Sequence, residues 1–170
     1  VSIMEGCDKA CTYCIVPKTR GQEISRPPQE IIDEINRLSD AGYKEVILLG
    51  QNVNSYGKRF PDGSGFKGPL GRLRLLEENP DSLLDFAQLL GLINRRTNIR
   101  RIRFTTSHPF DANERLFEAM RDCESVCEWL HLPVQSGSNR ILRAMRRGYT
   151  AEAYLEKIER LRELVPDVSL

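Results

Sequence analysis

The feature that most constrains the fold is an alternation of short apolar runs with segments of helical periodicity. Glu45–Leu49 is a nearly continuous apolar run, which is typical of a strand covered on both faces of a parallel sheet. Before it, apolar side chains recur at helical spacing over Ile31–Leu38, and Gly42 fits the end of that helix. Strands that alternate with helices predict βαβ units joined by right-handed crossovers. The chain is therefore expected to be α/β, with a parallel sheet that either curls toward a barrel or is doubly wound.

The same patterns give the expected elements in order. Strands are expected at residues 1–5, 45–49, 101–105 and 128–132, with the start of a fifth near Val168. Helices are expected from Pro27–Pro28 onward and over 83–93, 111–121, 138–145 and 150–164. A loop over residues 50–81, rich in glycine, separates the second strand from the next helix, and loops of that length are usually functional or mobile.

Length and charge narrow the class of protein. The 170 residues suit one domain, spanning 1–170, and both ends look cut, so we expect a fragment of a longer protein. The net charge of +1 gives no global basic field for nucleic acid or membranes, although a local basic face is still possible. The sequence shows neither an apolar run long enough to span a membrane nor a signal peptide. A cytoplasmic protein with no membrane partner is expected.

Three of the five cysteines, Cys7, Cys11 and Cys14, lie within eight residues as a C-x3-C-x2-C run. An odd count with this clustering fits a metal site in a reducing compartment better than a disulfide framework. Thiolates are the ligands of iron–sulfur clusters, and three of them leave one iron of a 4Fe–4S cluster open to an amine and a carboxylate. The triad follows the first strand, and ligand sites of α/β folds lie beyond the carboxyl ends of strands.

Two other interpretations of the triad stay open. A structural zinc ion normally takes four protein ligands, and His108 or His131 would have to be the fourth. The thiols could also be free. Cys123 and Cys127 form a second C-x3-C pair, but free cysteine is often a small buried hydrophobe, so this pair is assigned no ligand role.

Several segments of the sequence, near the triad and far from it, match the motifs of a known family. Six of them resemble the radical S-adenosylmethionine (SAM) methylthiotransferase family, above all its MiaB-type tRNA-modifying branch: Met4–Cys7, Tyr13–Pro17, Thr19–Gly21, Ser25–Pro27, Leu48–Tyr56 and His131–Ser138. The motifs spread from residue 4 to about 150, so the resemblance covers nearly the whole chain. It implies a parallel-stranded partial (β/α) barrel of the radical SAM type, truncated after about four βα units.

The resemblance also implies a reaction. A 4Fe–4S cluster on Cys7, Cys11 and Cys14 reduces SAM to methionine and a 5′-deoxyadenosyl radical. The radical takes hydrogen from C2 of an isopentenylated adenosine beside the tRNA anticodon, and a methylthio group is inserted there. Family members carry a second 4Fe–4S cluster in an N-terminal domain and a C-terminal RNA-binding module, which lie outside this sequence. A reductant such as flavodoxin or ferredoxin and a monomeric state are expected.

Site residues follow from the same resemblance. Contacts with SAM are implied for Tyr13, for Gly50, Gln51 and Asn52 after the second strand, for Ser107 after the third, and for Gln135 and Ser136 after the fourth. Plain packing, strand-end turns and, for Ser138, an N-cap are the competing roles. A core role is expected for His131.

Two clusters of Lys and Arg residues could bind tRNA phosphates. Lys18, Arg20 and Arg26 lie in the cysteine loop, and a substrate role is favoured for them. Arg143, Arg146 and Arg147 end a helix, where cations are favoured by the dipole and stay solvated.

The main rival is a sister enzyme that methylthiolates a ribosomal-protein aspartate. That enzyme usually shows Asp-Gly-Cys and Ala-Gln-Asp where this chain has Glu5-Gly6-Cys7 and Gly50-Gln51-Asn52, so tRNA is favoured. A zinc-binding interaction module without activity is the second rival.

Overall fold

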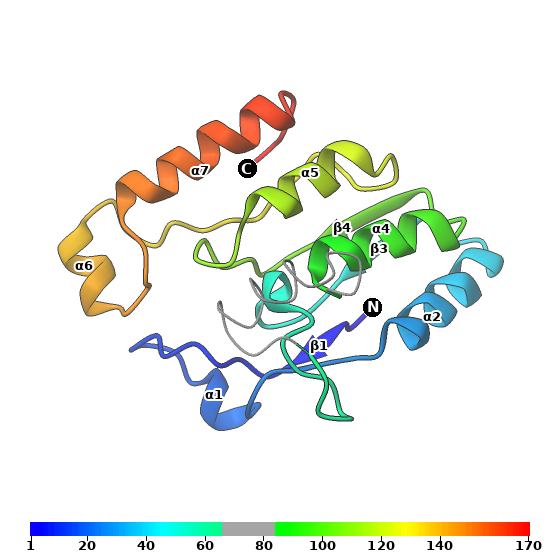
Figure 1. Cartoon of the computed structure of the whole chain (residues 1–170), viewed down its shortest axis with the longest axis horizontal. Coiled ribbons are helices and arrows are strands. Elements are labelled where there is room, and N and C mark those ends of the chain that lie inside the picture. The colour runs from blue at the N-terminus through cyan, green and yellow to red at the C-terminus, as the bar shows by residue number, and fades with distance from the viewer. Residues whose placement is uncertain (66–83) are drawn as a thin grey trace.

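The protein has an α/β fold, seen in a computed structural model that describes residues 1–65 and 84–170 (Figure 1). Its strands are β1 (Met4–Glu5), β2 (Ile24–Ser25), β3 (Glu45–Leu48) and β4 (Arg101–Phe104). Its helices are α1 (Val16–Thr19), α2 (Pro28–Asp40), the 3-10 turn η1 (Val53–Ser55), α4 (Phe86–Arg96), α5 (Glu114–Asp122), α6 (Asn139–Ala144) and α7 (Ala151–Leu164).

Parallel pairing runs across the centre of the fold. β3 pairs in parallel with β4, with Leu48 opposite Phe104. Isolated parallel bridges extend this pairing on both sides, from Ser2 to Leu49 and from Val126 to Ile102, and a further bridge joins Trp129 to Ser169. The predicted parallel arrangement is therefore confirmed. On either side of β3 and β4 the pairing consists of single bridges and not of full strands.

Two predicted strands differ from the structure. In place of one strand over residues 1–5, the first three residues run beside Leu49 and β1 turns away to pair antiparallel with β2. Residues 128–132 pair only through the bridge at Trp129. Pro133 lacks a backbone N–H, and Trp129 hydrogen-bonds back to Cys127, so a regular ladder does not extend here.

The predicted helices are present, with ends shifted by a few residues. Helices α2, α4, α5 and α7 pack side by side in that order and form one layer, clearest at the upper right of Figure 1. Between this layer and the strands lies the core, in which Phe104 is fully buried and meets Phe86 edge-on at 4.9 Å between ring centroids. Gly42 has the left-handed backbone expected of a helix stop, with φ of 93°.

Helices cover only one face of the described strands. Val46 and Leu48 are buried, whereas Ile47 and Leu49 are 42% and 46% exposed. The prediction that β3 is buried on both faces is therefore wrong for the described residues. Arg103 lies opposite Ile47 in the ladder and is exposed with it, so the open face mixes apolar and basic side chains.

The long loop after β3 contains η1 and then a turn around Gly63. Most of the predicted loop beyond it, including Gly68 and Gly71, and the predicted start of the next helix at Leu83 lie outside the described residues. None of the helices in residues 1–65 and 84–170 has the length and apolar character needed to cross a membrane.

Candidate metal centre

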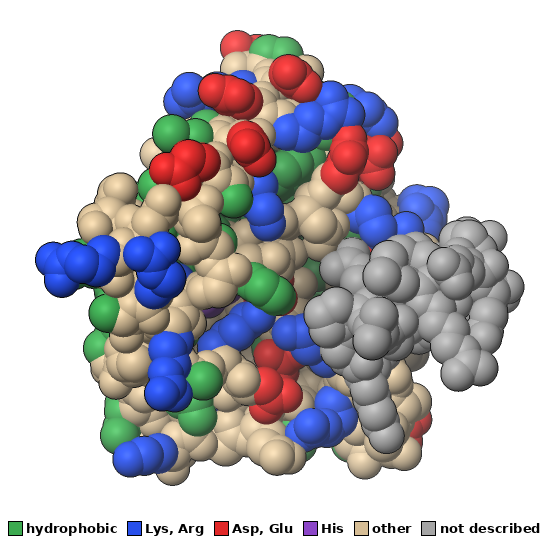
Figure 2. All heavy atoms as spheres, turned by 60° about the vertical axis from the view of Figure 1, so that its left-hand side comes forward, with side chains coloured by type: hydrophobic (Ala, Val, Ile, Leu, Met, Phe, Trp, Pro, Cys, Tyr) green, Lys and Arg blue, Asp and Glu red, His purple; other side chains and the backbone are tan. Residues whose placement is uncertain are grey.

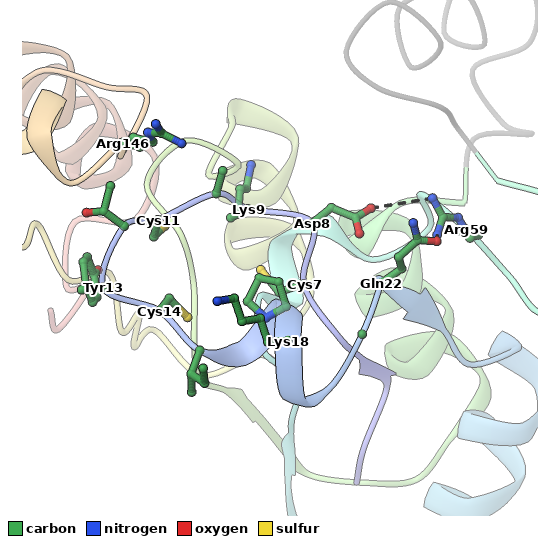
Figure 3. A pocket seen from close by; sticks show the side chains of 15 residues that line it. Cys7, Asp8, Lys9, Cys11, Tyr13, Cys14, Lys18, Gln22, Arg59 and Arg146 are labelled. Carbon is green, nitrogen blue, oxygen red and sulfur yellow. Dashed lines mark hydrogen bonds and ion pairs between the residues drawn. The ribbon is translucent and has the colours of Figure 1, made fainter.

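The three clustered cysteines line one cavity of about 790 Å³ (Figure 3). The loop that carries them, residues 6–22, leaves β1 and returns as β2, so the antiparallel pair closes its base. The Cys7 N–H donates to Gly21 O at 3.2 Å. Gly6 has φ of 73°, and a Cβ there would lie 2.1 Å from Gln22 O, so only glycine permits this closure.

The far side of the loop is fixed to the end of α6. Thr12 donates its N–H to Met145 O at 3.3 Å and its Oγ1 hydrogen to Ala144 O at 3.1 Å. Between the second and third cysteines, the Cys14 N–H donates to Cys11 O at 3.1 Å in a tight turn. These hydrogen bonds fix the positions of Cys11 and Cys14 relative to the end of α6.

His108 and Arg147 both approach the Cys11 thiol. His108 Nε2 lies 3.9 Å from Cys11 Sγ, and Arg147 Nη1 lies 3.3 Å from it. The Phe110 N–H donates to His108 Nδ1 at 3.1 Å, so the neutral ring carries its proton on Nε2, which faces the sulfur. Burial, with the charges of Arg147 and Lys9, lowers the pKa of His108 to about 3. The imidazole is therefore neutral at physiological pH and offers an N–H to the thiol.

The donor set fits a cluster better than a single ion. Among the described residues, no three Cys, His, Asp or Glu side chains converge closely enough to hold one metal ion. A cubane cluster is ligated at three different irons, so its thiols stand farther apart around one cavity. Burial raises the pKa of Cys7, because the charged thiolate is disfavoured away from water.

Unpartnered polar atoms gather after β3 and β4. Gln51 Oε1, Asn52 Oδ1 and Ser107 Oγ are buried and have no hydrogen-bond partner among the described residues. Such orphaned groups are uncommon in native folds and indicate an absent ligand or water. Gly50 lies against Met4, whose Cγ would be 2.4 Å from an added Cβ. Three of the residues predicted to contact SAM thus present unused polar groups, and Gly50 lies in the same segment.

A polar network that the sequence did not reveal joins the cysteine loop to these strand ends. Asp111, which follows β4, accepts hydrogen bonds from Lys9 Nζ at 3.0 Å and from Asn52 Nδ2 at 2.6 Å. Burial raises the pKa of Asp111, but Lys9 and Lys58, with these hydrogen bonds, outweigh it and leave the pKa below its ordinary value. Lys9 and Asp111 are 102 positions apart, and the position of Lys9 inside the triad was the only available hint.

The remaining predicted SAM contacts lie nearer the surface. Tyr13 is 55% exposed at the rim of the cavity. Gln135 is exposed and has φ of 71°, and Ser136 accepts a hydrogen bond from the Ser138 N–H at 3.1 Å. Ser138 stands at the N-cap of α6, but its side chain makes no capping bond. Of the residues predicted to contact SAM, Tyr13 lines the cysteine cavity, whereas the other six do not: Gly50, Gln51, Asn52, Ser107, Gln135 and Ser136.

The basic residues lie in two places. Lys18 lines the cavity together with Arg59 and Arg146, and Arg20 is exposed nearby. Arg26 lies elsewhere, where its Nη1 is 2.8 Å from Glu34. Figure 2 shows Lys and Arg side chains gathered on this side of the molecule, the side on which α1 and α6 lie in Figure 1.

Two expectations about single residues are wrong. Arg147 is only 7% exposed, although it was expected to stay solvated. His131 is exposed and stacks on Trp129 with a centroid distance of 6.4 Å, so it has no core role. Cys123 is buried in the core and Cys127 is partly buried.

The chain is similar to known proteins in both sequence and fold. The chain matches the Radical SAM superfamily over residues 1–170. Over its 170 residues it is 51% identical to the tRNA-2-methylthio-N(6)-dimethylallyladenosine synthase of Caldicellulosiruptor saccharolyticus and 46% identical to the protein of that name from Protochlamydia amoebophila. It covers 32% and 34% of those proteins, so it spans about a third of the length of the curated relatives it matches.

Solved structures agree on the fold. The methyltransferase TsrM from Kitasatospora setae, described as a radical SAM enzyme with cobalamin and a [4Fe-4S] cluster bound, matches with a TM-score of 0.65 at 17% identity, over 98% of this chain and 28% of that one. The cobalamin-dependent radical SAM enzyme OxsB matches with a TM-score of 0.63 at 15% identity, over 96% of this chain and 22% of that one. At such identities the likeness concerns the fold alone.

Proposed function

Because the chain belongs to the radical SAM superfamily, we propose that it is the radical SAM core of a tRNA methylthiotransferase. The observation that carries the proposal is the set of three free thiols, Cys7, Cys11 and Cys14, around one cavity. These residues would hold a 4Fe–4S cluster with one iron open to SAM. When bound, that cluster supplies the electron that cleaves SAM to methionine and a 5′-deoxyadenosyl radical.

SAM would lie between the cluster and the strand ends. The unused polar atoms of Gln51, Asn52 and Ser107 suit the amine, carboxylate and hydroxyl groups of SAM. Gly50, which packs against Met4, would contact SAM through its backbone. Tyr13 at the rim would stack against the adenine or pack over the cluster. Gln135 and Ser136 would reach the ribose or the substrate. The face of β3 and β4 that helices leave open would be the inner wall of a partial barrel truncated after about four βα units.

The substrate would be an isopentenylated adenosine beside the tRNA anticodon, modified at C2. Identities near 50% to proteins named as tRNA-2-methylthio-N(6)-dimethylallyladenosine synthases support this choice over a ribosomal protein. Phosphates would be met by Lys18, Arg20 and Arg26, of which Lys18 lines the cavity. We further propose a second 4Fe–4S cluster in a preceding domain, reduction by flavodoxin or ferredoxin, a monomeric state and a cytoplasmic location.

The cofactor part is tested by anaerobic iron–sulfur reconstitution and EPR of the reduced protein, with and without SAM. The intact protein should give a 4Fe–4S signal that SAM perturbs. Cys11→Ala should lack that signal, whereas Cys127→Ala, a partly buried cysteine away from the cavity, should keep it. Tight zinc binding with no cluster in the intact protein would contradict the proposal and favour a structural module.

The substrate part needs the full-length protein in a host that lacks its own enzyme. Mass spectrometry of digested tRNA should show the methylthio adenosine with the wild-type protein and only its unmodified precursor with Cys11→Ala. A methylthiolated ribosomal protein together with unmodified tRNA would identify the sister activity.

A further inference from the structure

Arg147 is a buried cation without a counter-ion in the described part of the chain. It is 7% exposed, and it donates hydrogen bonds to the Tyr149 hydroxyl at 3.3 Å and to Cys11 Sγ at 3.3 Å. Neither partner is a carboxylate. A buried charge is normally paired, because leaving water unpaired is expensive. The guanidinium therefore indicates an anion beside it, and the atom it contacts there is a predicted cluster ligand.

The backbone around Arg147 is held in an uncommon conformation. Arg146 has φ of 54° and Gly148 has φ of 71°, so two left-handed residues flank the arginine. A Cβ on Gly148 would lie 3.1 Å from Phe110. Left-handed backbone at a residue with a side chain is costly and persists where the surroundings enforce it, which is common at functional sites. This turn directs Arg146 to the cavity and Arg147 into the interior.

Tyr149 fixes the orientation of the guanidinium. The Tyr149 hydroxyl donates to Val134 O at 2.7 Å, and Arg147 Cζ lies 5.6 Å from the centre of the tyrosine ring. Contact of a cation with an aromatic face is favourable, more so when both are shielded from water. Arg147 is thus positioned before any cofactor binds.

We propose that Arg147 tunes the reduction potential of the cluster by donating an N–H to Cys11 Sγ. The inference rests on the proposed function, because it requires a 4Fe–4S cluster on Cys7, Cys11 and Cys14. Reduction adds one electron to the cluster and so one negative charge. A fixed positive charge and a hydrogen bond to a ligating sulfur stabilise the reduced state more than the oxidised state, and both are known determinants of cluster potential. Arg147 therefore raises the potential, and the cluster accepts its electron more readily.

The test is a redox titration of the reconstituted protein without SAM, followed by EPR, on the wild type, Arg147→Lys, Arg147→Gln and Arg140→Gln. The radical SAM cluster is identified in each sample as the signal that changes when SAM is then added. We expect Arg147→Gln to lower the reduction equilibrium constant about tenfold, a shift of about 59 mV for one electron toward more negative potential. Arg147→Lys keeps the charge but loses the planar guanidinium, so its reduction potential should lie between those of Arg147→Gln and the wild type.

Arg140→Gln is the matched control, because it removes the same charge from an exposed position on α6, the helix that precedes the turn of Arg147. Its potential should equal that of the wild type. If Arg147→Gln assembles a cluster at the wild-type potential, the inference is wrong while the proposed function stands. If Arg147→Gln assembles no cluster, the Arg147→Lys potential decides, and a wild-type value there overturns the inference. If the wild type itself assembles no cluster, the proposed function fails and the inference with it.

Discussion

Asp111 joins three segments that are distant in the sequence, and the cysteine loop depends on it. The side chain of Asp111 is 10% exposed. Its carboxylate accepts hydrogen bonds from Lys9 in the loop and from Asn52, which follows β3, and Lys58 Nζ lies 3.6 Å away. Since Lys9 stands between Cys7 and Cys11, any change at Asp111 should reach the thiols through Lys9.

We expect Asp111→Asn to destabilise the protein by about 3 kcal/mol, because it leaves the partly buried Lys9 without its carboxylate partner and removes one of the two partners of Lys58, the other being Glu23. Urea unfolding at neutral pH measures this loss. Asp122→Asn, at a surface pair with Arg121, should leave the urea midpoint near that of the wild type. Equal midpoints for Asp111→Asn and the wild type would show that the network adds nothing to stability.

The stabilisation that Asp111 provides through its lysine partners should decrease as the pH falls. The folded pKa of Asp111 is lowered, so its contribution is fully present above the ordinary carboxyl pKa. That contribution is lost as the pH falls from there through the folded pKa. The stability difference between the wild type and Asp111→Asn should therefore shrink in acid, and a difference that grows in acid would contradict the lowered pKa.

Gly6 and Gly21 provide a matched comparison at the base of the cysteine loop. Both have left-handed backbone, with φ of 73° and 74°, but an added Cβ meets Gln22 O at 2.1 Å in the first case and nothing within 4 Å in the second. Gly21→Ala should cost about 1 kcal/mol, for backbone strain alone. Gly6→Ala should cost about 3 kcal/mol and reduce cluster incorporation, because the carbonyl must move. Thermal unfolding and iron content measure the two effects, and equal losses would refute the close contact.

Among the elements, α6 and α7 begin with similar residues but different capping. Thr150 Oγ1 accepts the Ala153 N–H at 3.2 Å at the start of α7, whereas Ser138 makes no such bond at the start of α6. Thr150→Ala should therefore destabilise by about 1 kcal/mol, while Ser138→Ala should have little effect. Urea unfolding of the two variants tests this, and a larger loss at Ser138 would reverse the assignment.

Part of the fold could be predicted from sequence patterns. The spacing of apolar residues predicted helices α2, α5 and α7, in which Ile31, Leu116 and Ile158 are buried. The alternation of helices and strands predicted the parallel pairing of the strands. The one-sided burial of β3 did not follow, because a continuous apolar run is compatible with an open face when other parts of a fold lie against it. Residues 128–132 have strand-forming side chains, but Pro133 and the local hydrogen bonds decide otherwise.

The candidate site was predictable where its residues are close in sequence. The cysteine spacing located the cavity, because one short loop carries all three thiols. Asp111 and Arg147 could not be assigned, since each meets the loop only after more than a hundred residues of chain have folded back. In the sequence Arg147 follows a predicted helix as a solvated cation would, and the left-handed backbone at Arg146 and Gly148 turns it inward.

For the whole molecule, the cysteine cavity and the hydrophobic core are separate. The core contains residues of the strands and the helical layer, such as Leu48, Leu90 and Phe104, and none of the three clustered cysteines. The cysteine loop is held by backbone hydrogen bonds, by Thr12 on α6 and by Lys9 on Asp111, and it buries little apolar surface of its own. Local stability follows buried apolar contacts and shielded hydrogen bonds, so the loop should be the first region to open.

Removal of the cluster with a chelator should therefore leave the body of the protein folded. Amide hydrogen exchange should stay slow in β3, β4 and α4 and become faster in residues 6–22, because only that loop loses a ligand that ties it together. Binding of a group to the folded state alone stabilises that state, so the loaded protein should also unfold at a higher temperature than the stripped one. The Cys11→Ala variant treated with chelator is the control, since it should exchange like the stripped wild type in both regions. Global loss of protection on cluster removal would instead mean that the fold needs the cluster, and that the core formed by the strands and the helical layer is insufficient by itself.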